Sequence, residues 1–266
     1  MSTMSYAAAD SATMLRRSVR HMIRYPSMTL LLAFMPIVLL LIFVYVFGGT
    51  LGSGLGLVPG GGRSAYISYV VPGIIVLSIA CVVQATAISV AMDMTTGIIA
   101  RFRTMAISRS SVLTGHVLGT QIQTLFTLVL VVGVGLAIGF RPHAGPLAWL
   151  AVIGILLMTS FALTWLSVAL GLVAKTVESA SNLPMFLTLL PFLGSGFVPT
   201  ASMPIGLRWF AEYQPFTPVT ETVRGLLVGG PVGSHAIVSA AWAVGIALVS
   251  YVWAKRLYNR GPQLPR

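Results

Sequence analysis

Long apolar stretches separated by short clusters of charge dominate the hydrophobic pattern of this chain. Six intervals contain no Asp, Glu, Lys or Arg, and each can hold the roughly 20 apolar residues that cross a hydrocarbon core. The pattern predicts membrane-spanning helices near residues 28–47, 65–92, 112–140, 146–174, 182–198 and 236–258. The predicted fold class is therefore an all-α polytopic membrane protein with six transmembrane helices.

Composition supports a chain that folds in a bilayer. Of its 266 residues, 56% are hydrophobic and 8% are charged, against roughly 25% charged residues in soluble domains. A soluble fold would leave large apolar patches exposed to water. The net charge of +11 comes from basic clusters between apolar stretches, which indicates topology signals rather than nucleic-acid binding. The single cysteine, Cys81, lies in an apolar run and permits no disulfide within the chain.

The basic residues fall mainly on one side of the predicted spans. Twelve of them lie in the N-terminal segment, the second–third loop, the fourth–fifth loop and the C-terminal tail. The other side carries only Arg63, Arg141, Arg208 and Arg224. Because basic residues concentrate on the cytoplasmic side of membrane proteins, both termini are expected in the cytoplasm, with residues 261–266 as a short tail.

Residues 1–26 precede the first span and contain an amphipathic pattern. One helical face carries four apolar residues, namely Leu15, Val19, Met22 and Ile23, and the opposite face carries three arginines. One interpretation is a basic helix that lies on the inner membrane surface. The other is a plain charge cluster that fixes topology.

Two further segments outside the spans also have a pattern. In the loop 93–111, apolar positions recur at helical spacing beside arginines, which indicates either a short helix that docks on another protein or a solvated loop. Residues 199–230 contain repeated prolines and short apolar runs. They predict a re-entrant or interfacial element, with an ordinary external loop as the alternative.

Motifs for nucleotide binding and for catalysis are missing from the sequence. The two lysines, Lys175 and Lys255, each follow an alanine, so the chain lacks the Gly-Lys of a Walker A loop. It also lacks H-E-x-x-H and G-x-S-x-G. We therefore expect no enzyme activity from this chain alone, and neither a cofactor nor a metal on it. His116 lies inside the third span, where it is either a hydrogen-bonded packing residue or a proton relay.

Several motifs carry a resemblance to a known family. They comprise a Y-x-x-P-G at the start of the second span (Tyr69, Pro72, Gly73), the stretch Ser195–Pro204 with Phe197, Pro199 and Pro204, the residues Gln214 and Pro215, and an acidic-x-x-R (Glu221, Arg224). With the amphipathic helix and the basic loop Gly97–Arg109, they make the chain similar to type-2 ABC transporter permeases, in the drug-resistance branch typified by daunorubicin exporters. Gln214 departs from the family, which usually has Asn there.

The resemblance implies an ABC type-2 transmembrane domain over residues 27–260, in a multi-pass protein of the bacterial cell membrane. Such a permease would pair with a second copy of itself or with a related permease. Each permease would contact a separate ATP-binding cassette subunit, which would hold ATP and Mg. The candidate coupling residues are Gly97, Arg101, Phe102 and Arg103. The cargo would be a hydrophobic or amphiphilic drug, antibiotic or lipid-like molecule, moved outward.

The resemblance also implies a pathway between two permeases, lined by the first, second and fifth spans. Its polar points would be Ser68, Ser78, Gln84, Ser181, Asn182 and Ser195. Two alternatives stay open at this point. One is a permease that exports glycans or polysaccharides, and the other is a membrane scaffold that transports nothing.

Overall fold

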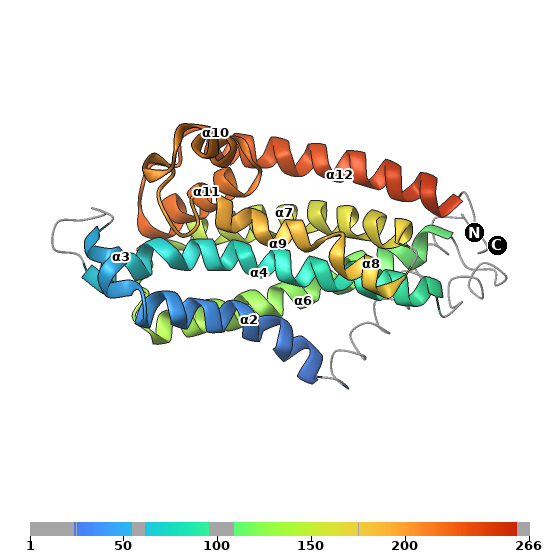
Figure 1. Cartoon of the computed structure of the whole chain (residues 1–266), viewed down its shortest axis with the longest axis horizontal. Helices are drawn as coiled ribbons and strands as arrows, with labels where there is room; N and C mark the ends of the chain where they lie inside the picture. Colours follow the sequence, from blue (N-terminus) through green and yellow to red (C-terminus); the bar gives the residue numbers. More distant parts are fainter. Residues whose placement is uncertain (1–23, 25, 55–61, 96–108, 175, 260–266) are drawn as a thin grey trace.

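The computed structural model describes residues 24, 26–54, 62–95, 109–174 and 176–259, and every regular element among them is a helix (Figure 1). In chain order they are α2 (Pro26–Tyr45), α3 (Gly48–Gly54), α4 (Gly62–Thr95), α6 (Arg109–Ala137), α7 (Pro146–Val173), α8 (Val177–Asn182), α9 (Met185–Leu189), the 3-10 helices η1 (Leu190–Leu193) and η2 (Thr200–Ser202), α10 (Ile205–Tyr213), α11 (Phe216–Val228) and α12 (His235–Asn259).

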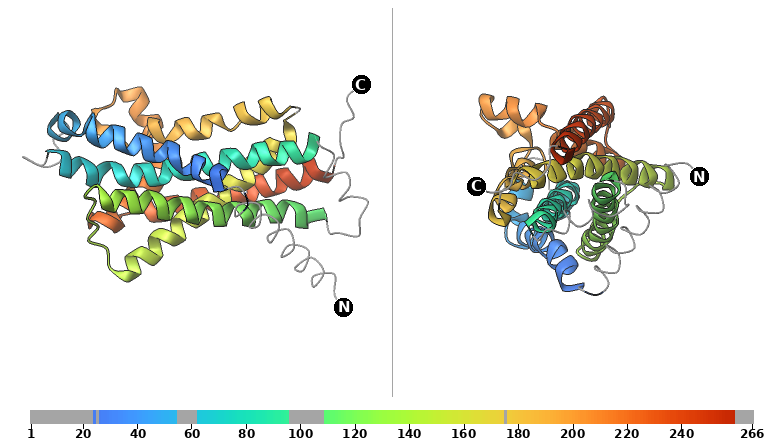
Figure 2. Two further views of the ribbon diagram at one scale, coloured as in Figure 1. Left: turned by 90° about the horizontal axis from the view of Figure 1, so that it is seen from below. Right: turned by 90° about the vertical axis from the view of Figure 1, so that its right-hand side faces the viewer.

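Helix α4 occupies the centre of the bundle. It contacts α2, α3, α6, α7, α8, α9 and α11. In its most hydrophobic stretch 72% of the residues are buried, against 17% in the corresponding stretch of α12. Helix α12 packs mainly on α7 and α11 and lies at the rim of the bundle (Figure 2). A helix that is hydrophobic all round and also buried all round is the expected core of a membrane bundle.

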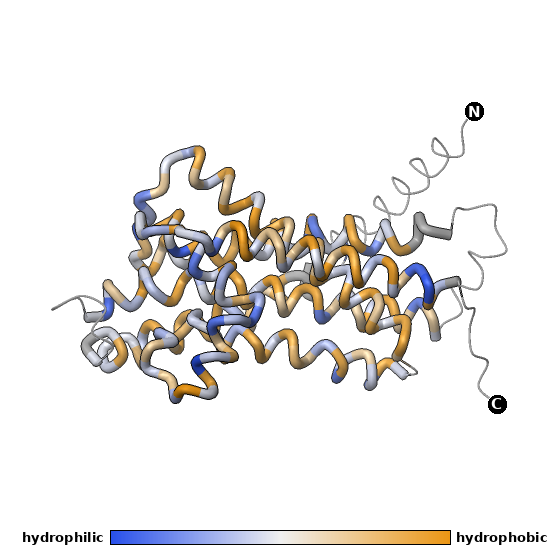
Figure 3. Tube along the Cα trace, turned by 90° about the horizontal axis from the view of Figure 1, so that it is seen from above, coloured by the Kyte–Doolittle hydropathy of each residue, from blue (hydrophilic) through white to orange (hydrophobic). Residues whose placement is uncertain are grey.

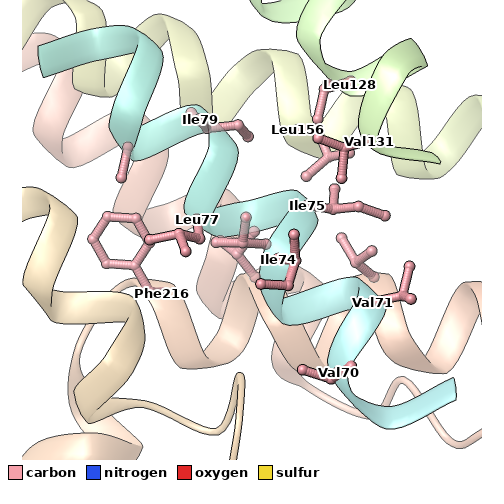
Figure 4. Close-up of a cluster of buried hydrophobic side chains, with 14 of the residues drawn as sticks. Val70, Val71, Ile74, Ile75, Leu77, Ile79, Leu128, Val131, Leu156 and Phe216 are labelled. Atoms are coloured by element: carbon pink, nitrogen blue, oxygen red, sulfur yellow. The ribbon is translucent and has the colours of Figure 1, made fainter. Parts of the chain in front are cut away.

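The largest apolar cluster forms where α4 meets α6, α7 and α11 (Figure 4). Helix α4 contributes a run of branched side chains, including Val70, Ile74 and Ile75, each fully buried. Leu156 of α7 and Phe216 of α11 close the cluster from two sides. Because lipid tails are as apolar as these side chains, close packing rather than removal from water stabilises such a cluster in a bilayer.

Four helices in the described residues are long and apolar enough to cross a membrane: Gly62–Thr95, Leu113–Ala137, Pro146–Val173 and His235–Tyr258. They correspond to the second, third, fourth and sixth spans expected from the sequence. The apolar stretch Leu30–Tyr45 of α2, at the position of the first expected span, is shorter. Hydrophobic residues run along these helices for most of their length (Figure 3).

The sequence predicts the fifth span as one helix near residues 182–198, but the structure has several short helices there. Helix α8 begins earlier, at Val177, where the Thr176 hydroxyl accepts from the Ser179 backbone and the Ser179 hydroxyl accepts from Thr176 in return. The pKa of Glu178 in this first turn is lowered, chiefly by its own backbone N–H. The helix then breaks at Pro184, which lacks a backbone N–H. Two short helices, α9 and η1, follow the break.

Several sequence-based predictions concern residues outside the described part of the chain. They are the amphipathic helix within residues 1–26, apart from Arg24, the candidate coupling residues Gly97, Arg101, Phe102 and Arg103, and the tail 261–266. The helices on either side of the predicted coupling loop are described, because α4 ends at Thr95 and α6 begins at Arg109.

Candidate functional site

The side chain of Arg224 connects three segments that lie far apart in the sequence. Its guanidinium donates to the backbone carbonyl oxygen of Tyr69 in α4, from Nε at 3.3 Å and from Nη2 at 3.2 Å. Nη2 also donates to the carbonyl oxygen of Ser195, at 2.7 Å. The planar fork of donors on arginine suits such a set of acceptors. We call Tyr69, Ser195, Glu221 and Arg224 the Arg224 junction.

Tyr69 meets this arginine with its ring as well as its backbone. The guanidinium carbon lies 3.8 Å from the ring centroid, within the range of a cation–π interaction. The Tyr69 hydroxyl donates to the same Ser195 carbonyl, at 2.8 Å. Pro72 follows in the next turn and has no backbone N–H, so this part of α4 lacks one helical hydrogen bond. One turn of α4 therefore holds both Arg224 and the chain at Ser195.

Glu221 balances the charge of the junction. It lies one turn before Arg224 on α11, and its carboxylate accepts from Nη1 at 2.5 Å. The arginine side chain is 14% exposed and the glutamate side chain 30% exposed. A cation held this far from water is costly unless an anion and good acceptors surround it. The acidic-x-x-R motif supplies this pair from a single helix.

A close contact between two glycines brings the junction together. A Cβ atom added to Gly73 would overlap the carbonyl oxygen of Gly196. The second span can therefore approach the backbone after η1 this closely only because Gly73 has no side chain. The glycine of the Y-x-x-P-G motif thus has a packing role, and its partner is a glycine of the motif stretch Ser195–Pro204.

Side chains satisfy the backbone of this non-helical region. Thr217 of α11 accepts from the Ser195 N–H at 3.3 Å, and Gln214 donates to the Leu190 carbonyl at 2.9 Å. Tyr66 of α4 donates to the Phe197 carbonyl at 3.4 Å. Irregular backbone at membrane depth is tolerated where protein covers it and supplies such partners.

The remaining motif residues set helix starts and ring packing. Pro199, Pro204 and Pro215 directly precede η2, α10 and α11, each with φ near −60°. Their fixed φ favours the beginning of a new helix. The ring of Phe197 stacks on Phe192 with centroids 4.7 Å apart and an interplanar angle of 6°. All the family motif residues outside the coupling loop therefore lie in or beside one structural unit.

A second contact, which the sequence did not reveal, spans the break in the fifth predicted span. The side chain of Gln84 on α4 donates to the Ser181 carbonyl of α8 at 3.1 Å. It also accepts from the Thr188 hydroxyl of α9 at 3.0 Å. One amide thus fixes both sides of the break at Pro184. The polar residue Gln84 was noted in the sequence, but its partners could not be read from it.

Not all the expected polar points of the pathway are available to a cargo. Ser78 and Ser195 are buried, and the Ser78 hydroxyl donates to its own helix at the Ile75 carbonyl, 2.6 Å away. Asn182 is exposed and Ser68 is half-buried.

Gly171 is another residue that sequence reasoning missed. It lets α7 approach α4, because an added Cβ would lie 2.6 Å from the Ala87 carbonyl oxygen.

Comparison with known proteins supports the family expected from these motifs. The family model described as ABC-2 type transporter matches residues 11–228. A daunorubicin resistance ABC transporter permease protein of Streptomyces coeruleorubidus is 27% identical over 245 residues, which cover 91% of this chain and 81% of the relative. Probable doxorubicin resistance ABC transporter permease proteins of two Mycobacterium tuberculosis strains are 27% identical over 166 residues, which cover 62% of this chain and 60% of each relative.

Proposed function

This chain belongs to the ABC-2 type transporter family, and we propose that two such permeases, each with a separate ATP-binding subunit, form an exporter of hydrophobic or amphiphilic compounds. The chain itself is the membrane permease subunit of an ABC transporter. The Arg224 junction carries the mechanistic part of the proposal, because it joins the segments that contain the family motifs to helix α4.

Helix α4 supplies the mechanical connection in this mechanism. Asp93, near one end, and Tyr69, in the junction, are separated by about 36 Å along the axis at 1.5 Å per residue. Beyond Asp93 the chain leads into the predicted coupling loop. A movement imposed there by the ATP-binding subunit would reach the junction through a buried, rigid helix. Because Arg224 and Gly73 fix the junction to α4, the segment around Ser195 would move with it.

The ATP-binding subunit supplies the energy in this proposal. The sequence lacks the Gly-Lys of a Walker A loop, so ATP and Mg would be held by the partner. ATP binding there would favour one of two arrangements of the permease helices, and hydrolysis would release it. The excess of basic residues near the predicted coupling loop and in the tail supports placing this end of the bundle in the cytoplasm.

A second copy of the chain would cover the face formed by α9 and η1. Five of their apolar side chains are exposed, namely Met185, Phe186, Leu189, Phe192 and Leu193. A helix broken at Pro184 leaves the Ala180 carbonyl without its usual N–H partner. Broken backbone of this kind is tolerated beside protein or a water-filled path but not against lipid. In a homodimer, the second copy would cover this backbone with protein, and a water-filled path would lie between the two copies.

The proposed cargo follows from a further exposed apolar surface, on α2, and from the relatives. Exposed residues of α2, including Leu31, Phe34 and Met35, are also apolar, and they favour a partly aromatic or lipid-like compound over a sugar or a bare ion. The relatives are named for resistance to daunorubicin and doxorubicin. We therefore take doxorubicin as the first compound to test.

The test begins with the complex. The chain is co-expressed in turn with candidate ATP-binding cassette subunits, purified, and placed in lipid nanodiscs. We expect stable co-purification and vanadate-sensitive ATP hydrolysis that doxorubicin changes at least twofold. A membrane scaffold would be favoured instead if the permease co-purifies with none of the ATP-binding subunits tried. The same holds if no amphiphile changes the rate of ATP hydrolysis by the complex.

A further inference from the structure

A second pair of ionisable side chains lies at the opposite end of α4 from the Arg224 junction. Asp93 is two residues from the end of α4, and its Oδ2 atom lies 3.0 Å from Nε2 of His116 in α6. The side chains are only 13% and 16% exposed, respectively. An aspartate carboxylate this close to an imidazole nitrogen accepts a hydrogen bond from it and fixes the ring orientation.

The pair joins the two helices that carry the predicted coupling loop. Helix α4 ends at Thr95 and α6 begins at Arg109. A contact between Asp93 and His116 therefore closes the base of the loop on both sides. A mostly buried aspartate in a membrane protein is costly to keep without a specific role.

Two threonines extend this contact deeper into the bundle. The Thr120 hydroxyl donates to the His116 carbonyl at 2.9 Å, and it lies 2.7 Å from the Thr86 hydroxyl of α4. The two hydroxyls are within hydrogen-bond distance, and either oxygen can be the donor. Both threonines are buried. We call Asp93, His116, Thr120 and Thr86 the polar seam between α4 and α6.

We propose that Asp93 and His116 are positioning residues that make α4 and α6 move as one unit when the ATP-binding subunit acts on the loop between them. This inference rests on the proposed function as an ATP-driven exporter. Without the pair, the loop would move while α4 followed only in part. ATP hydrolysis would then continue, but a smaller part of the loop's movement in each cycle would be transmitted to the Arg224 junction.

The first readout is the number of doxorubicin molecules transported per ATP hydrolysed by the reconstituted complex. We expect Asp93→Ala and His116→Ala, neither of which can form the hydrogen bond, each to lower this ratio about tenfold, while hydrolysis stays within about twofold of the unchanged protein. The double exchange Asp93→His with His116→Asp restores part of the ratio because it rebuilds the pair. The matched control is Ser89→Ala, an exposed position on the same helix.

The second readout is backbone hydrogen exchange in residues 86–95 and 109–120 of the same complex, which does not depend on transport. We expect the two single variants to exchange faster in both segments, and the double exchange to slow them again. Unchanged exchange in the single variants overturns the inference whatever the transport result. A proportional loss of transport and hydrolysis also overturns it, because it indicates damage to the whole fold. Absence of transport by the unchanged protein contradicts the proposed function alone, since the exchange experiment still tests the pair.

Discussion

The guanidinium carbon of Arg224 lies 3.8 Å from the centre of the Tyr69 ring, although the two residues are 155 positions apart in the sequence. Arg224 also hydrogen-bonds to the Tyr69 carbonyl, so it contacts both the ring and the backbone of one residue. This relationship fixes α11 on α4 and places the chain at Ser195 between them. A single side chain thus connects α11, α4 and the segment around Ser195.

Replacing Arg224 tests that connection. Arg224→Lys keeps the charge but loses the planar fork, and we expect it to lower the free energy of unfolding by about 2–3 kcal/mol. Arg224→Ala also leaves Glu221 without its partner, and we expect a loss of about 3–5 kcal/mol. The measurement is reversible unfolding of the purified protein in mixed micelles.

The matched control uses another arginine in the same region. Arg208 pairs with Glu212 at 2.7 Å on α10, but the two side chains are 50% and 40% exposed. We expect Arg208→Ala to change the free energy of unfolding by less than about 1 kcal/mol. Equal losses for Arg208→Ala and Arg224→Ala would mean that the junction has no special energetic role.

The contact between Gly73 and Gly196 predicts a position that tolerates no side chain. Because a Cβ on Gly73 would overlap backbone rather than a movable side chain, we expect Gly73→Ala to cost about 1–3 kcal/mol and to reduce transport. Gly133→Ala in α6 is the control, since nothing lies within 4 Å of its added Cβ. The control should be neutral or stabilise the helix by up to about 1 kcal/mol. Similar behaviour of both variants would disprove the close approach.

The contact across the helix break predicts a graded series. Thr188→Val removes one of the two hydrogen bonds of Gln84, with an expected loss of about 1 kcal/mol in the free energy of unfolding. Gln84→Leu removes both and leaves the Ser181 carbonyl without its donor, so we expect a loss of about 2–3 kcal/mol. Unfolding in mixed micelles measures both. The reverse order of effects would show that Gln84 does not secure the break.

The proposed homodimer predicts cross-links from α9. Cys81 is the one cysteine of the chain, so Cys81→Ala gives a background without thiols. In that background we expect Leu189→Cys, 51% exposed on α9, to form a disulfide-linked dimer in membranes under mild oxidation. Val249→Cys is the control, because this residue is 70% exposed on α12, the helix at the rim of the bundle (Figure 2). A dimer that forms only through Val249→Cys would place the interface elsewhere.

The sequence predicted the long helices well, because charged residues mark their ends. The apolar run between Arg63 and Asp93 lies within α4, and the sixth span predicted near residues 236–258 lies within α12. The predicted fifth span extends too far. Its apolar sequence continues through Pro184 and Pro191, but the α-helix does not continue through them. Those prolines, and the Thr176–Ser179 capping pair at the start of α8, were signals for the true bounds.

The candidate site could be predicted only in part. Family motifs identified Tyr69, Gly73, Glu221 and Arg224, but nothing in a linear pattern shows that a carbonyl at Ser195 joins them. Contacts between residues more than a hundred positions apart depend on how the helices pack. The spacing of hydrophobic residues along the sequence does not show which helices pack against each other. The role of Gln84 was missed for the same reason.

The most direct test of the exporter is ATP-dependent movement of doxorubicin in inside-out membrane vesicles that contain the permease and its ATP-binding subunit. We expect doxorubicin to accumulate inside the vesicles when ATP is added, vanadate to stop the accumulation, and Arg224→Ala to reduce it at equal amounts of folded complex. Accumulation that is the same with and without ATP, in vesicles where the complex is assembled and hydrolyses ATP, would show that the complex is not an exporter of doxorubicin.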